Sequence, residues 1–176
     1  MTGGEVARVV RTNAGMCAVW QPEAFHFDEF VEWEDWATEN QRLLESITEG
    51  TFIPVNVGGD GVFGVVVRWN ASAALTAREE EYLVVSSEPY LFECRGSFAM
   101  GGLEEVGNDS LAPSSPIPLA SGRYAVTVFL IDWKADSRSV DALGKPTDTA
   151  LPDLVVLFNK EATGPFRTRL ETFDRP

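Results

Sequence analysis

The chain has 176 residues, of which 44% are hydrophobic and 23% are charged, a composition typical of one globular domain rather than of a disordered segment. Its 14 Lys and Arg residues stand against 27 Asp and Glu residues, which gives a net charge of −13. Such a charge repels nucleic-acid phosphates and anionic lipid head groups, so we expect neither direct nucleic-acid binding nor membrane-surface binding. The acidity fits either simple solubility or a surface that attracts a basic protein.

The N-terminal third begins with segments that predict strands. Residues 5–11 and 16–21 are rich in valine and are separated by residues 13–15, which predicts a strand pair joined by a turn. In residues 25–28, aromatic and polar side chains alternate, as in a half-buried strand. Cys17 and the second cysteine of the chain, Cys94, are not spaced as a CxxC motif, so we expect two buried, reduced thiols.

The segment from Asp28 to Gly50 has helical periodicity. Asp28 can cap its start and Gly50 can end it, while Asn40 is a polar gap in the series. The residues that recur on one face in steps of three or four are Phe30, Trp33, Ala37, Leu44 and Ile47. We therefore predict one amphipathic helix near residues 29–49.

The same region concentrates the negative charge of the chain. Residues 23–49 contain nine acidic residues and one basic residue, Arg42, so this segment carries −8 of the net charge of −13. Trp36 falls off the apolar face of the predicted helix, and an exposed Trp among carboxylates is typical of a protein interface. The residues predicted to bind a basic protein partner are Glu32, Glu34, Asp35, Trp36 and Glu39.

Residues 51–57 and 62–69 are β-branched runs separated by a Gly-rich turn, which predicts a hairpin. Pro54 lacks a ladder donor, so the first of these strands should lie at an edge or carry a bulge. Residues 59–64 also match G-x-G-x-x-G, the dinucleotide-binding pattern, but that pattern must lead into a helix. Because a strand follows here, we interpret the match as a turn.

Further along, residues 76–81 predict a short helical turn and residues 81–100 predict two strands broken by a proline. The apolar run at residues 124–133 predicts a central strand buried on both faces, and residues 151–160 predict a last strand. From residue 161 to residue 176 we expect a loosely ordered tail. The many short strands predict a mainly β fold, an antiparallel β-sandwich or flattened barrel, formed as one domain over the whole chain.

The order of these features resembles that of the competence protein J family, over roughly residues 28–133. The best-matched element is the apolar-Pro-Leu-x-x-Gly-x-Tyr pattern from Ile117 to Tyr124, in which a tight turn leads into a long strand. Members of this family are small bacterial proteins regarded as inhibitors of a DNA-entry nuclease. The resemblance implies a shared fold and a nuclease as the protein partner, although residues 107–116 and 134–150 depart from the family pattern.

His26 is the only histidine, so any catalytic triad must use it. Strand geometry would place His26 and Asp28 about 7 Å apart on one face, which suits a shared ligand or metal site as well as a plain histidine–carboxylate pair. The sequence contains no Walker A, HExxH, GxSxG or EF-hand motif, and we expect no cofactor.

Three hypotheses follow. The first is a non-enzymatic binding or inhibitory module whose acidic face docks a basic protein such as a nuclease. The alternative is a small-molecule-binding β-sandwich or a hydrolase with its site near His26. The third is a homodimer formed through the helix. The charged N-terminal residues do not resemble a signal peptide and no run of about 18 apolar residues occurs, so we expect a cytoplasmic location.

Overall fold

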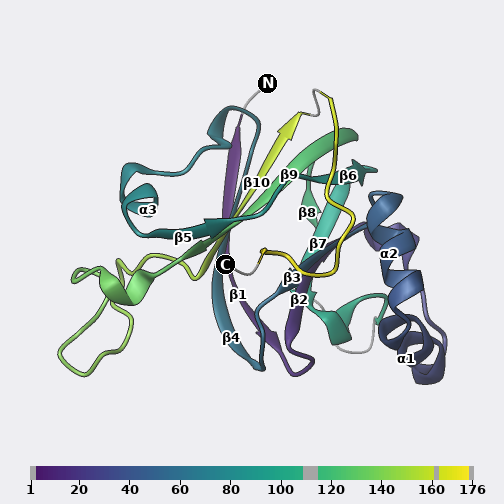
Figure 1. Ribbon diagram of the computed structural model, residues 1–176, viewed down its shortest axis with the longest axis horizontal. Helices are drawn as coiled ribbons and strands as arrows, with labels where there is room; N and C mark the ends of the chain where they lie inside the picture. Colours follow the sequence, from purple (N-terminus) through teal and green to yellow (C-terminus); the bar gives the residue numbers. More distant parts are fainter. Residues whose placement is uncertain (1–2, 109–114, 161–162, 175–176) are drawn as a thin grey trace.

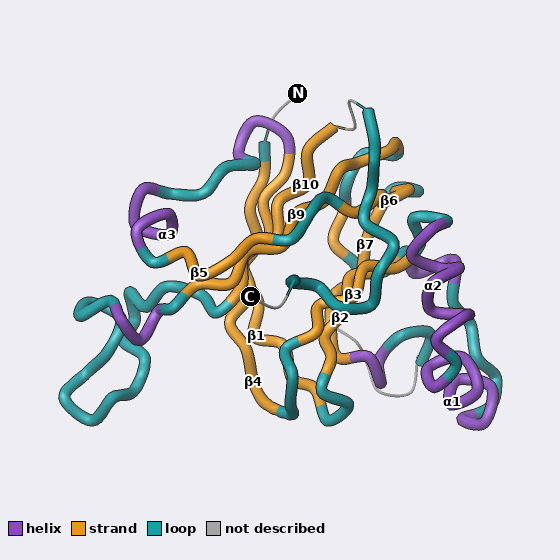
Figure 2. Tube along the Cα trace, in the orientation of Figure 1, coloured by secondary structure: helices purple, strands orange, loops and turns teal. Residues whose placement is uncertain are grey.

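The computed structural model describes residues 3–108, 115–160 and 163–174. Two β-sheets pack against each other, and the helices lie at the periphery (Figures 1 and 2). The larger sheet has the order β1-β4-β10-β9-β5, with β6 also paired to β9, and the smaller has the order β3-β2-β7-β8. In the larger sheet the strands are β1 (Gly4–Thr12), β4 (Gly61–Trp69), β5 (Leu83–Ser86), β6 (Tyr90–Cys94), β9 (Gly122–Ile131) and β10 (Leu154–Lys160). In the smaller sheet they are β2 (Met16–Trp20), β3 (Phe52–Asn56), β7 (Ser97–Gly102) and β8 (Ile117–Pro118).

This architecture confirms the mainly β, sandwich-like prediction. Within the described residues, every strand pair is antiparallel except β4 with β10, which is parallel. Rings from both sheets meet in the core: Phe98 of β7 stacks on Phe158 of β10 at a centroid distance of 4.7 Å. The inner faces of the two sheets therefore form one continuous core.

The strand positions were predicted better than the strand partners. Both predicted hairpins, β1–β2 and β3–β4, are wrong, because each turn passes from one sheet to the other. Instead β1 pairs with β4 and β2 pairs with β3. The two turns meet where the Gly15 N–H donates to Asp60 Oδ1 over 3.0 Å. As expected for a turn, residues 59–64 lead into strand β4 and not into a helix.

The predicted helix lies where expected but is divided in two. Helix α1 covers Phe30–Thr38 and α2 covers Asn40–Thr48. Glu39 between them has an extended backbone, with φ −94° and ψ 102°. The predicted helical turn is present as α3 (Ala77–Glu81), which begins with a capping box between Thr76 and Glu79.

Strands β9 and β10 form the middle of the larger sheet. Along β9, fully buried residues alternate with partly buried ones, so the predicted central strand is less buried on its outer face than expected. Strand β10 is buried on both faces from Leu154 to Phe158. Its outer residues Val155 and Leu157 are covered by side chains from the segments around Leu75 and Leu151.

Other predictions have mixed outcomes. Strand β3, which contains Pro54, lies at a sheet edge as predicted. Residues 25–28 do not form the predicted strand; they follow a 3-10 turn at Pro22–Ala24, and the Phe27 N–H donates to the Gly107 carbonyl over 3.3 Å. Cys17 and Cys94 are buried and free, as expected. Of the tail predicted at residues 161–176, the structure describes residues 163–174, which pack along the edge of β3; we call them the C-terminal strap.

Candidate partner-binding surface

Residues 23–49, which contain α1 and α2, form an arm at the edge of the sandwich next to β3 and β6 (Figure 1). We call this segment the acidic arm. Both helices pack on the sandwich through apolar side chains on their inner faces. Leu43 and Ile47 of α2 are 3% and 1% exposed and belong to the main core.

An aromatic cluster fixes α1 to the body. Trp36 lies 5.0 Å from Phe25, 5.6 Å from Phe27 and 5.3 Å from Phe52 of β3, measured between ring centroids. Such tilted and edge-on contacts are favourable for aromatic pairs. Gly107 permits the cluster, because a Cβ at this position would lie 2.5 Å from the Phe27 ring.

The prediction that Trp36 is an exposed contact residue is wrong. Trp36 is 6% exposed, and its indole N–H donates to Ser46 Oγ of α2 over 3.3 Å. The Ser46 hydroxyl in turn donates to the Arg42 carbonyl over 3.0 Å. The break at Glu39 explains the error, because it makes α1 a separate helix that packs against the body through a face of its own. Trp33 and Trp36, three residues apart, both lie on that face.

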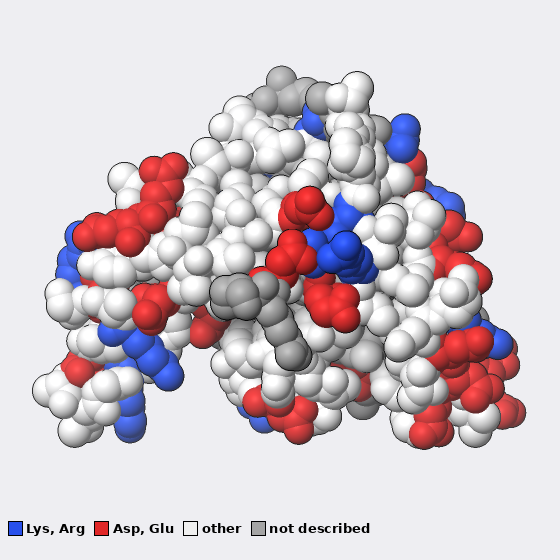
Figure 3. All heavy atoms as spheres, in the orientation of Figure 1, with Lys and Arg blue, Asp and Glu red and all other residues white. Residues whose placement is uncertain are grey.

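The outer side of the acidic arm is negatively charged and exposed. The nine exposed carboxylates of the arm are Glu23, Asp28, Glu29, Glu32, Glu34, Asp35, Glu39, Glu45 and Glu49. Figure 3 shows acidic side chains gathered over the region of α1 and α2. The only cation of the arm, Arg42, pairs with Glu39 over 2.8 Å. The predicted contact residues Glu32, Glu34, Asp35 and Glu39 thus lie on one accessible arm.

Two apolar residues on the arm were missed as surface residues. Phe30 is 66% exposed and Val31 is 59% exposed, although the periodicity assigned Phe30 to the buried face. Phe30 stacks on Trp33 at 5.4 Å, and the Trp33 indole donates to the Leu103 carbonyl over 3.2 Å. The position of Phe30 at the first residue of α1, before the buried face begins, is the signal that could have identified it.

His26 Nε2 lies 3.1 Å from Asp28 Oδ1, although residues 25–28 do not form the strand from which their proximity was predicted. Their side chains are 71% and 81% exposed, and neither lines the cavity described below. Among the residues that the structure describes, no group of three His, Cys, Asp or Glu side chains is placed to hold a metal ion. The pair therefore lacks the enclosure that a binding or catalytic site uses.

Glu104 and Glu105, next to the arm, are partly buried. Glu104 accepts hydrogen bonds from the Thr12 hydroxyl at 3.1 Å and from the Asn13 N–H at 2.8 Å. Burial and the charge of Glu104 raise the pKa of Glu105. Burial and these two carboxylates raise the pKa of Cys17 to about 12, which keeps its thiol protonated and unreactive at neutral pH.

Comparison with known proteins rests on the fold. No protein-family model and no curated protein sequence matches the chain. Among solved structures, ComJ from Bacillus subtilis, an inhibitor of the DNA-degrading activity of NucA, matches with a TM-score of 0.52 and 10% identity. The chain has a ComJ-like fold. The match covers 92% of this chain and all of ComJ, which extends the resemblance well beyond residues 28–133.

A second solved structure shares this ComJ-like fold. It is described as crocagin biosynthetic gene J and matches with a TM-score of 0.60 and 15% identity, over 92% of this chain and all of that chain. Within the described part of the chain, no helix has the length and apolar character needed to cross a membrane.

Proposed function

We propose that this protein is a non-enzymatic binding module that docks a basic protein, such as a nuclease, through its acidic arm. The observation that carries the proposal is the composition of the arm surface, where nine exposed carboxylates accompany the exposed apolar side chains of Phe30 and Val31. A basic partner is attracted over a long range by the carboxylates and then buries the apolar residues on contact.

The arm is suited to this role because it is rigid before binding. The aromatic cluster and the Trp36–Ser46 hydrogen bond hold α1 and α2 in place, so little conformational entropy is lost when a partner docks. The ComJ-like fold supports an inhibitory role by analogy, since the ComJ structure is that of a nuclease inhibitor.

The proposal is tested by neutralising charge on the arm without altering its shape. The variant Glu32→Gln/Glu34→Gln/Asp35→Asn removes three negative charges from the arm. Its matched control, Glu80→Gln/Glu81→Gln/Asp148→Asn, removes the same three charges from exposed positions outside the arm. Both variants are assayed for inhibition of DNA degradation by NucA and by a panel of nucleases with basic surfaces.

We expect the wild type and the control to inhibit at least one nuclease. The arm variant should associate roughly tenfold more slowly, and this difference should shrink at high salt as screening weakens steering. The proposal fails if no basic nuclease is bound or inhibited, or if the arm variant and the control behave alike.

A further inference from the structure

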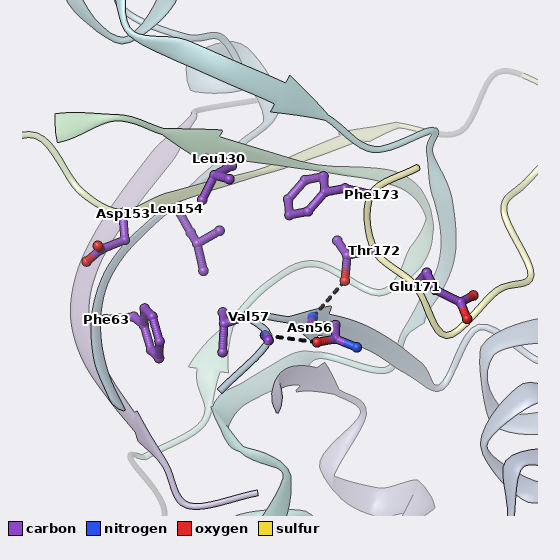
Figure 4. Close-up of a pocket in the computed structure, with 10 residues that line it drawn as sticks. Asn56, Val57, Phe63, Leu130, Asp153, Leu154, Glu171, Thr172 and Phe173 are labelled. Atoms are coloured by element: carbon purple, nitrogen blue, oxygen red, sulfur yellow. Dashed lines mark hydrogen bonds between the residues drawn. The ribbon is translucent and has the colours of Figure 1, made fainter. Parts of the chain in front are cut away.

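A cavity of about 360 Å³ lies between the two sheets, at the edge that the C-terminal strap covers (Figure 4). Its floor consists of Phe63 of β4, Leu130 of β9 and Leu154 of β10, three neighbouring strands of the larger sheet. Val57, just after β3, and Phe173 of the strap complete an apolar wall. The volume falls within the range of small-molecule sites, which begins at roughly 300 Å³.

The C-terminal strap forms the roof of this cavity and is fixed to both sheets. Thr172 Oγ1 accepts from the Asn56 N–H at 2.7 Å and donates to the Pro54 carbonyl at 2.9 Å, which ties the strap to β3. The Tyr90 hydroxyl of β6 donates to the Glu171 carbonyl at 3.2 Å, which ties it to the larger sheet. The cavity therefore has a defined shape, rather than being a gap beneath a loose tail.

The two carboxylates of the lining do not face the interior of the cavity. Figure 4 shows the Asp153 and Glu171 side chains on opposite sides of it, with their carboxylates directed away. Both Asp153 oxygens are already used, since Oδ2 accepts from the Gly64 N–H at 2.7 Å and Oδ1 accepts from the Trp133 indole at 2.8 Å. Glu171 is exposed to solvent. Neither charge is therefore available to a ligand inside.

The uncharged polar side chains of the lining are engaged as well. The Thr172 hydroxyl both donates and accepts within the protein, and the Asn56 side-chain carbonyl accepts from the Gly58 N–H at 3.0 Å. None of the ten lining residues is Lys, Arg or His. A polar group carried into this interior would lose its hydration without gaining a hydrogen bond, which costs free energy. Apolar cavities instead take up apolar molecules.

We propose that this cavity binds an uncharged, apolar small molecule. The ligand packs between Phe63 and Leu130 on the floor and Phe173 of the strap. Because the strap forms the roof, the ligand contacts the strap and the larger sheet at once, and its binding stabilises the attachment of the strap. This site includes neither the acidic arm nor His26, so the proposal stands independently of the function proposed for the arm.

The test uses three probes that share one ring system and differ in charge at pH 7, namely 1-methylnaphthalene, 1-naphthoate and 1-naphthylmethylamine. Binding is followed by the NMR methyl resonances of Leu130 and Leu154. We expect 1-methylnaphthalene to shift these resonances and to bind at least about tenfold more tightly than either charged probe. A general attraction to a chain with a net charge of −13 would favour the amine instead. A charged probe that binds as tightly as 1-methylnaphthalene would overturn the proposal, as would the absence of any shift with 1-methylnaphthalene.

Contacts in the wild-type protein locate the site. Intermolecular NOEs should join the naphthalene ring to the methyl groups of Leu130 and Leu154, and NOEs only to the exposed Val84 of β5 would place binding elsewhere. Val57→Trp fills the cavity from a partly exposed position and should abolish binding, whereas Val84→Trp should leave it unchanged. The thermal transition of each variant checks its folded state. Binding that survives in folded Val57→Trp would exclude the cavity as the site.

Binding should also protect the strap. The Asn56 N–H donates to Thr172 of the strap, so its hydrogen exchange reports attachment. A ligand that binds only when the strap is attached should slow this exchange about tenfold at a free concentration ten times its dissociation constant. 1-Naphthoate at the same concentration should leave the exchange unchanged. If bound 1-methylnaphthalene does not slow the exchange of Asn56, the ligand does not lie beneath the strap.

Discussion

The indole N–H of Trp36 donates to the hydroxyl of Ser46 across 3.3 Å, and this buried contact joins α1 to α2 within the acidic arm. Both side chains are almost fully buried. The most conspicuous aromatic residue of the arm therefore supports the structure of the interface instead of contacting a partner. Phe30 and Val31 are the apolar residues of α1 that a partner can reach.

Replacing Trp36 should cost stability. Trp36→Ala empties the centre of an aromatic cluster and should lower the free energy of unfolding by about 3–5 kcal/mol. Trp36→Phe keeps a ring but loses the bond to Ser46, and should cost about 1–2 kcal/mol. Urea denaturation at pH 7 measures both values. Unfolding free energies equal to that of the wild type would show that Trp36 does not hold the arm.

Phe30→Ala should weaken partner binding and leave the stability of the fold almost unchanged. Because Phe30 is 66% exposed, its removal should change the unfolding free energy by less than about 0.5 kcal/mol. At the centre of a docked interface, the same change should weaken partner binding by at least about tenfold, mainly through faster dissociation. Titration calorimetry with the inhibited nuclease measures the affinity. Unchanged affinity would place the contact elsewhere on the arm.

Gly107→Ala should disturb the base of the arm. Gly107 has a φ of +66°, and its added Cβ would meet the Phe27 ring at 2.5 Å, so we expect a loss of about 2–3 kcal/mol from backbone strain and steric overlap. Gly144→Ala is the matched control, with a φ of +74° and open space around its Cβ, and should cost about 1 kcal/mol. Equal losses in thermal unfolding would mean that the Phe27 contact contributes nothing.

Local sequence patterns predicted elements here because they depend on neighbours in the chain. The valine-rich run of β1 and the apolar run of β9 define strands by their own composition. The partner of a strand, in contrast, depends on the direction that the chain takes after each turn. The turns after β1 and after β3 look like hairpin turns, yet both cross between sheets, and no local pattern distinguishes the two outcomes.

The same limit applied to the candidate site. The charge of the arm could be predicted, since Asp and Glu side chains are almost always exposed. The orientation of Trp36 could not, because it depends on a break at Glu39 that changes which face of α1 meets the body. The cavity beneath the C-terminal strap combines residues from four distant segments, and no spacing in the sequence connects them.

The ion pair between Arg68 and Glu79 should make stability depend on pH. The Arg68 guanidinium contacts Glu79 at 2.7 and 2.9 Å, and their side chains are 9% and 3% exposed. Burial opposes ionisation of Glu79, but the hydrogen bonds from Arg68 and Thr76 outweigh it and lower its pKa below the ordinary value of 4.5. A carboxyl with a lowered folded-state pKa contributes stability above its unfolded pKa, and this contribution is lost as the pH falls through the folded pKa.

Glu79→Gln should therefore lower the free energy of unfolding by about 1–3 kcal/mol at pH 7, because it removes the buried counter-charge of Arg68 and leaves Arg68 paired with the more exposed Glu5. The difference from the wild type should decrease as the pH falls below 4.5. Glu80→Gln, at the exposed neighbouring position, should have little effect at either pH. Urea titrations at a series of pH values measure the difference, and a pH-independent loss would contradict a role for the ion pair.

Arg167 should control whether the C-terminal strap stays attached. Its side chain is 1% exposed and donates to Asp174 at 3.0 Å, a bond that lowers the pKa of Asp174 and keeps the pair ionised at neutral pH. Removing the guanidinium should release the strap locally, without unfolding the sandwich. Because the Asn56 N–H donates to Thr172 of the strap, its hydrogen exchange reports attachment.

In Arg167→Ala we expect the Asn56 amide to exchange at least about tenfold faster than in the wild type, while the buried amides of β10 keep their protection. Arg169→Ala, whose side chain is 68% exposed, is the control and should exchange like the wild type at Asn56. Faster exchange throughout β10 would mean that Arg167 stabilises the whole sandwich. Unchanged exchange at Asn56 would show that Thr172 and Tyr90 hold the strap without it.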